Sequence, residues 1–178
     1  MEKLRDTWSS GDPYEYFMGR WSKLTARVFL RWLNFPYNMS WLDLGCGTGA
    51  LSEATSQQCK PAYLSCIDTS AEFLEKAKEK ISNKADFLEG DASKIPKADN
   101  SFDIVVSGLA LNFFPDLSAA LSEMRRVLKV NGTIAAYVWD YAGRMDFLRI
   151  FWNAAAEVDP EAHNLMKEFG FRFVMLRA

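Results

Sequence analysis

The chain has 178 residues, of which 49% are hydrophobic and 25% charged, a balance typical of one globular domain with a sizeable core. A formal net charge of −2 without a basic run argues against a broad electrostatic grip on nucleic acid or an anionic membrane. No apolar run reaches the roughly 18 residues of a membrane span, and the charged, aromatic start is unlike a signal peptide.

Cysteine and histidine usage narrows the chemistry further. The three cysteines form no C-x-x-C pair, which favours reduced thiols and a cytoplasmic protein. The single histidine, His163, lies in a polar stretch, so we predict no metal site and no histidine-based catalysis.

Residues 1–39 are predicted to form an aromatic N-terminal segment followed by a helix. From Trp21 onward apolar residues recur at helical spacing, and Pro36 ends the pattern. The predicted apolar face is Leu24, Val28, Phe29 and Trp32. Residues 14–21 have two interpretations, which are packing of a helix onto the sheet and a flap that closes over a ligand.

The rest of the chain is organised around residues 41–51, a short apolar run that breaks into Gly45, Gly47 and Gly49 and then starts a helix. Glycines allow backbone angles that side chains forbid, and they let another molecule approach the main chain. A strand, a glycine turn and a helix N-terminus form a nucleotide-sized site in an open α/β sheet. The same glycines also satisfy the dinucleotide fingerprint, so this signal alone leaves the ligand open.

Five strand-like runs alternate with helical stretches, which predicts βαβ units and a mostly parallel sheet with helices on both faces. The predicted strands are Ser40–Leu44, Ala62–Asp68, Ala85–Asp91, Phe102–Leu109 and Thr133–Asp140.

Helix signals separate these runs. One helix is predicted over Ser52–Gln58, and Thr69 with Glu72 forms a capping box for the next. An apolar stripe of period 3.6 runs from Leu117 to Leu128, with Glu123, Arg125, Arg126 and Lys129 off it, and Asn131-Gly132 is expected to stop that helix.

Polar side chains finish the apolar runs, all at one edge of the predicted sheet. Four of them are acids, Asp43, Asp68, Asp91 and Asp140, and the fourth run leads into Ser107. Ligands in such sheets bind beyond the carboxyl ends of the strands, so this edge is the predicted site.

Asp68 carries the most specific signal because it ends the second run about twenty residues beyond the glycine turn. A carboxylate offers two acceptor oxygens to the two hydroxyls of a ribose. The alternative is that Asp68 only neighbours the cap of the following helix.

Five motifs in order resemble the class I S-adenosylmethionine-dependent methyltransferases, closest to the ubiquinone and menaquinone biosynthesis branch. They are residues 43–49 (Asp-Leu-Gly-Cys-Gly-Thr-Gly), Asp68, residues 90–92 with Ile95-Pro96, residues 101–109, and residues 128–133. The resemblance implies a three-layer Rossmann-like fold and S-adenosylmethionine as cofactor. It implies cofactor contacts from Asp43, Gly45, Gly47, Thr48, Asp68, Thr69, Asp91, Ala92 and Ser107, and from Arg20 if residues 14–21 form a flap.

The acids favour this cofactor over NAD. S-adenosylmethionine has no phosphate but carries a sulfonium and an ammonium, and Asp43 is placed to receive the ammonium. An acid facing the pyrophosphate of NAD would be unfavourable. No residue is identified as a catalytic base. Asp140 and Tyr141 are either polar loop residues or residues on the side of the methyl acceptor, and the sequence favours neither. Residues 112–114 are expected to line the pocket of a small-molecule acceptor.

The C-terminal part departs from the family pattern. Residues 145–158 and 164–170 are predicted helices, and only residues 171–178 are left for an edge strand, so the edge strands are missing or reduced. We therefore expect one methyltransferase domain divided into residues 1–39, 40–140 and 141–178, with self-association through an exposed sheet edge. Two functions stay open, methyl transfer to a small molecule and cofactor binding without turnover.

Overall fold

The computed structural model describes residues 18–81, 85–139 and 146–160. These residues belong to two compact units, with the division between Tyr137 and Val138. The first unit contains the sheet and the second contains α6, Asp146–Val158. The single domain and the boundaries that the sequence predicts stay a prediction.

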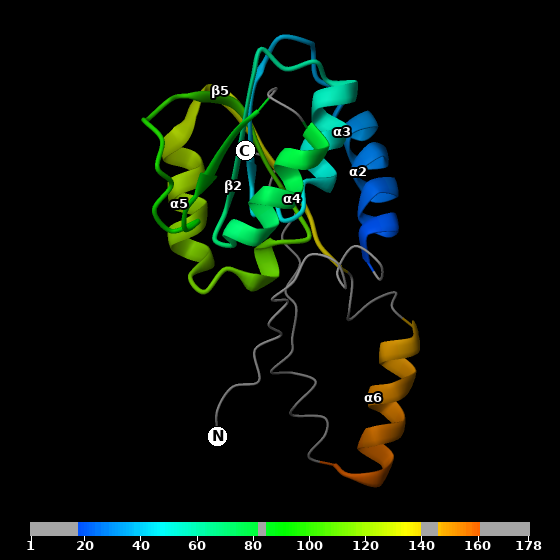
Figure 1. Cartoon of the computed structure of the whole chain (residues 1–178). Helices are drawn as coiled ribbons and strands as arrows, with labels where there is room; N and C mark the ends of the chain where they lie inside the picture. Colours follow the sequence, from blue (N-terminus) through cyan, green and yellow to red (C-terminus); the bar gives the residue numbers. More distant parts are fainter. Residues whose placement is uncertain (1–17, 82–84, 140–145, 161–178) are drawn as a thin grey trace. The chain divides into compact units, whose positions relative to one another are not determined.

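The first unit is built on five parallel strands in the order β3-β2-β1-β4-β5 (Figure 1). The strand order reverses at β1, because β2 pairs with one side of β1 and β4 with the other. This topological switch point is where open α/β sheets bind ligands. The strands are β1 Ser40–Leu44, β2 Tyr63–Asp68, β3 Asp86–Glu89, β4 Phe102–Gly108 and β5 Leu128–Tyr137.

Helices cover both faces of the sheet, so the predicted three-layer α/β class is confirmed (Figure 1). Alternate residues of β1 point to opposite faces. Trp41 packs in a core with α2 (Arg20–Leu33), α3 (Ala50–Gln58) and α4 (Ala71–Ile81). Leu42 and Leu44 pack in the other core with α5 (Leu117–Val127) and with the loop that carries Ala92 and Ile95.

The predicted helix after residue 20 is present, but its predicted apolar face is largely wrong. The sheet side of α2 is formed by Ser22, Ala26, Phe29 and Leu30, whereas Leu24, Val28 and Trp32 are about half exposed. The helix carries apolar residues on both sides, so periodicity alone could not identify the buried side. The end is as predicted, because Asn34 adopts a left-handed conformation just after Leu33.

The start of β5 also differs from the prediction. Helix α5 ends at Val127, and Asn131-Gly132 does not stop it but lies inside β5. Asn131 has φ of +65°, and the pairing of β4 with β5 shifts between Phe102 and Ile104. The dipeptide therefore marks an irregularity within the strand rather than the end of a helix.

Several predicted features lie outside the described residues. They are residues 1–17, Asp140, Tyr141, His163, the helix over 164–170 and the strand over 171–178. Among the described residues, β3 and β5 form the two edges of the sheet.

Candidate functional site

The glycine turn is fixed to the carboxyl end of β2. The backbone N–H groups of Gly45 and Cys46 both donate to the carbonyl oxygen of Ile67, at 2.8 and 3.1 Å. Gly45 has φ of +72°, and a Cβ there would lie only 2.5 Å from the Cβ of Ala110. Position 45 therefore requires glycine for its conformation and for the close approach of the segment after β4.

Gly47 is different, because a Cβ at this position would meet no atom within 4 Å. Its φ is +54°, and its neighbour Thr48 is buried. The space beside Gly47 is thus open to a ligand at the switch point of the sheet.

Asp43 is fully buried beneath the turn. Its Oδ2 accepts a hydrogen bond of 2.5 Å from the hydroxyl of Ser52 in the first turn of α3, whereas its Oδ1 has no partner. Burial raises the pKa of Asp43 from 3.8 to about 7, with an opposing effect from Ser52 and a further increase from the charge of Asp68. A carboxyl group in this state has an oxygen available to a cationic donor.

Asp68 links the turn to the next helix. Its two carboxylate oxygens accept from the backbone N–H groups of Gly47 at 2.8 Å and Ser70 at 2.9 Å. Burial raises the pKa of Asp68, although the backbone N–H groups of Ser70, Gly47 and Thr69 oppose this shift. Each oxygen keeps a second acceptor site, so helix support and ribose binding are compatible.

The predicted capping box of Thr69 and Glu72 is wrong, because the side-chain cap of α4 comes from the next residue and the third helical position is Phe73. The hydroxyl of Ser70, rather than that of Thr69, accepts the backbone N–H of Phe73 at 3.3 Å at the start of α4. Thr69 is exposed, and its backbone N–H contributes to the environment of Asp68.

Asp91 follows β3 and is exposed, with one oxygen held and one free to bind. Its Oδ1 accepts from the backbone N–H and the hydroxyl of Ser93, both at 2.7 Å. The Ser93 backbone N–H, followed by its hydroxyl, lowers the pKa of Asp91, so the group is a stable anion. The next residue, Ala92, is buried.

Two predicted site residues have other partners. The buried hydroxyl of Ser107 donates to the carbonyl oxygen of Leu44 at 2.7 Å and so connects β4 to β1. The guanidinium of Arg20 lies 5.0 Å from the ring centroid of Trp21 at the start of α2. A cofactor contact by either side chain stays a prediction.

The segment predicted to line an acceptor pocket follows β4 and contains a short 3-10 helix, Leu111–Phe113. The ring of Phe114 lies close to the turn, since a Cβ on Gly45 would be 3.3 Å from its Cε1 atom. Phe113 is half exposed, and the Nδ2 atom of Asn112 is buried without a partner. Of this segment, Ala110 and Phe114 adjoin the turn.

Sequence reasoning missed the polar network behind the turn. The thiol of Cys66 donates to Ser52 Oγ at 3.2 Å, and Ser52 in turn supports Asp43. A hydrogen bond with Cys66, followed by burial, raises the pKa of Cys46 well above its usual value, so this thiol is unreactive. The position of Ser52 could have indicated this contact, because the first turn of a helix after such a strand faces the end of the strand.

The charges of the site suit a cation. Neither Asp43 nor Asp68 has an ion-pair partner within the described ranges. In their ionised form these two carboxyl groups would repel a pyrophosphate, whereas an ammonium would stabilise the ionised form that burial disfavours. The part of the chain that is described holds no cluster of three or more histidine, cysteine or acidic residues suited to a metal ion.

A family model described as "Methyltransferase domain" matches residues 42–136. The chain belongs to this methyltransferase family, which confirms the predicted class and, with it, S-adenosylmethionine as the cofactor of the class.

Known proteins agree with this family. The chain is 42% identical over 96 residues to a demethylmenaquinone methyltransferase of Staphylococcus aureus. The aligned residues make up 52% of the chain and 40% of the relative. In fold it is similar to the methyltransferase in complex with the Trm112 activator of Haloferax volcanii, with TM-score 0.69, 23% identity and coverages of 85% and 72%. It is also similar to a provisionally assigned S-adenosylmethionine-dependent methyltransferase of Methanococcus maripaludis, with TM-score 0.64, 21% identity and coverages of 88% and 73%.

The chain thus matches 40% of the length of that curated relative. The residues matched by the family model include the glycine turn and the sheet from β1 to β5. No helix in the described ranges has the length and apolar character needed to cross a membrane.

Proposed function

We propose that this chain binds S-adenosylmethionine at the carboxyl ends of β1, β2 and β3 and transfers its methyl group to a small-molecule acceptor. The observation that carries the proposal is the buried Asp43, whose Oδ1 has no partner and whose charge adds to that of Asp68. A ligand with an ammonium group would donate a hydrogen bond to the free oxygen and would neutralise the negative charge. When bound, S-adenosylmethionine supplies an activated methyl group on a sulfonium.

Different residues of this chain bind different parts of the cofactor. Asp43 accepts a hydrogen bond from the ammonium, and Asp68 accepts from the ribose hydroxyls through its remaining acceptor sites. Asp91 accepts from the exocyclic amino group of adenine, with Ala92 beside it. Gly47 allows the close approach of the ligand to the main chain because the space beside it is open. Arg20 is the proposed partner of the cofactor carboxylate.

The protein's part in the reaction is to align the acceptor with the methyl group and to exclude water. We propose that the segment after β4, with Phe114 against the turn, contributes to the acceptor side. The relative from Staphylococcus aureus is named for demethylmenaquinone, which supports an acceptor of the small-molecule class. A cytoplasmic location fits the three free thiols.

Calorimetry with S-adenosylhomocysteine and NAD tests the cofactor. We expect binding of S-adenosylhomocysteine and none of NAD, and the reverse preference would refute the proposal. Incubation with radiolabelled S-adenosylmethionine and a panel of phenolic, amine and quinone acceptors tests turnover. Binding without transfer to any acceptor would favour the alternative, a domain that binds the cofactor without turnover.

A further inference from the structure

The loop between β3 and β4 carries Asp91 and Ala92 but has no helix or strand from residue 90 to residue 101. Ordering such a segment costs conformational entropy, so contacts must hold it in place. The contacts come from α5, on the same face of the sheet.

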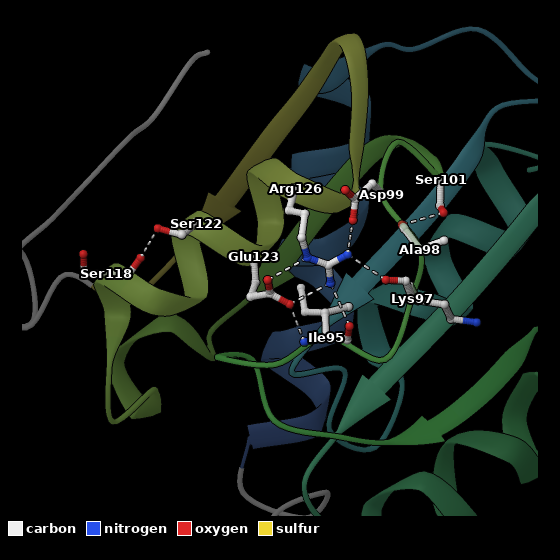
Figure 2. Close-up of polar contacts among 9 residues, drawn as sticks. All are labelled: Ile95, Lys97, Ala98, Asp99, Ser101, Ser118, Ser122, Glu123 and Arg126. Atoms are coloured by element: carbon white, nitrogen blue, oxygen red, sulfur yellow. Dashed lines mark hydrogen bonds and ion pairs between the residues drawn. The ribbon is translucent and has the colours of Figure 1, made fainter.

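All five N–H donors of Arg126 in α5 are used, and three of them bind the far end of this loop (Figure 2). Two donors reach the carbonyl oxygens of Ile95 and Lys97, both at 2.9 Å, and a third reaches Asp99 at 2.6 Å. The remaining two bind both oxygens of Glu123 at 2.7 Å. Glu123 Oε2 also accepts the backbone N–H of Ile95 at 2.8 Å, which satisfies both backbone groups of that residue.

The gripped end is rigidly connected to Asp91. The carbonyl oxygen of Asp91 accepts from the N–H of Lys94 at 3.0 Å, directly before Ile95. Ala92 and Ile95 are both buried in the core that α5 shares. Gly90 leaves no spare room, since a Cβ there would lie 3.1 Å from Pro96. A displacement at Ile95 would therefore move Asp91.

We propose that Glu123 and Arg126 are positioning residues for the adenine end of the cofactor, acting through Asp91. The inference rests on the proposed function, in which Asp91 accepts from the exocyclic amino group of adenine. It predicts that the pair determines base selectivity and does not merely support the fold. Arginine is needed because its planar fork reaches several acceptors at once, which a lysine ammonium cannot do.

The test compares two ligands, S-adenosylhomocysteine and its analogue with hydrogen in place of the exocyclic amino group. The wild-type protein should prefer the first by about tenfold or more, the value of one hydrogen bond to a charged acceptor. Arg126→Ala should reduce this preference to about threefold or less. Arg126→Lys, which keeps the charge, should reduce it similarly and serves if the alanine variant does not fold. Arg125→Ala is the matched control, because Arg125 is the exposed neighbour on α5 and should leave the preference unchanged.

A double-mutant cycle identifies the route. In an Asp91→Ala background, which has no side-chain acceptor, Arg126→Lys should cause no further loss of preference, because both changes remove the same contact. If the Arg126 variants weaken both ligands equally, the pair supports only the fold and the inference is overturned. If the wild-type protein binds S-adenosylhomocysteine but shows no base preference, the inference fails while the proposed function stands. Absence of any S-adenosylhomocysteine binding would overturn both.

Discussion

Protonation of Asp43 should control the affinity for S-adenosylhomocysteine. In the free protein its pKa is raised from 3.8 to about 7 by burial, and its Oδ1 has no partner. An ammonium that donates to this oxygen requires the ionised form. Below about pH 7 the protein must therefore release a proton when it binds the ligand, and the affinity should fall as the pH falls.

The magnitude follows from the shift. The pKa of Asp43 lies about three units above its ordinary value. Ionising the buried group without a cation therefore costs about 4 kcal/mol more than ionising the same group in water. The folded state binds this proton more tightly than the unfolded state. The contribution of Asp43 to stability should therefore decrease as the pH rises from about 4 to about 7 and stay constant above that. The dissociation constant of S-adenosylhomocysteine should increase about tenfold for each pH unit below about 7.

Calorimetry in buffers of different ionisation enthalpy measures both the dissociation constant and the number of protons released on binding. Near pH 6 the wild-type protein should release nearly one proton per ligand bound, and near pH 8 almost none. Asp43→Asn should abolish this proton release. The ligand control is 5′-methylthioadenosine, which keeps the adenine, ribose and thioether but lacks the ammonium, so its affinity should not depend on Asp43.

Two results would refute this reasoning. A flat affinity of the wild-type protein for S-adenosylhomocysteine from about pH 6 to about pH 8 would mean that no ammonium meets Asp43. An equal pH dependence for 5′-methylthioadenosine would assign the titration to another group, and Asp68 is the nearest candidate because its pKa is also raised.

Three further predictions concern Asp68, the glycine turn and the edge of the sheet. Asp68→Ala should weaken S-adenosylhomocysteine by about 2–3 kcal/mol in calorimetry. The same change should lower the free energy of unfolding in urea by about 1–2 kcal/mol, since Asp68 supports two backbone N–H groups; equal stability would contradict this. Gly45→Ala should lower the thermal midpoint strongly, because the added Cβ would lie 2.5 Å from the Cβ of Ala110. Gly47→Ala adds only the strain of its positive φ, so it should lower the midpoint less and should weaken ligand binding; equal effects on stability would contradict the distinction. Self-association through the β5 edge should be visible in light scattering and reduced by Val130→Lys; a wild-type protein that stays monomeric at high concentration would exclude it.

The hydrogen bonds of Asp68 show what the sequence could not supply. From the sequence, a strand-end acid that faces a ligand is expected to contribute little to folding. In the structure its oxygens accept from Gly47 and Ser70, and Gly47 lies 21 residues earlier in the chain. The spacing predicts that the acid reaches the site, but hydrogen bonds to the protein's own backbone depend on the turn geometry.

The sequence predicted the bounds of a strand well where one short apolar run determines them. The strands β1, β2 and β4 lie within two residues of their predicted bounds, because each is a compact apolar run that ends in a polar residue. The burial of α2 was misjudged since Leu24 and Val28 match the helical period as well as Ala26 and Leu30 do. Only the packing partner distinguishes such faces.

The Glu123–Arg126 pair was equally invisible to pattern reasoning. Both residues lie off the apolar stripe of α5, which ordinarily indicates a solvated face. Their partners are backbone groups of Ile95 and Lys97, about 30 positions earlier, and backbone atoms carry no sequence signature.

In the proposed site the cofactor side and the acceptor side come from different parts of the chain, so we expect binding and turnover to be separable. Asp43, Asp68 and Asp91 each lie near or just after the end of a strand, and their hydrogen-bond partners come from residues 47–93. The proposed acceptor-side residues come from the segment after β4. A substitution in the glycine turn should therefore reduce both affinity and methyl transfer. A substitution at Phe113 should reduce methyl transfer alone, because its half-exposed ring supports no contact of the three acids.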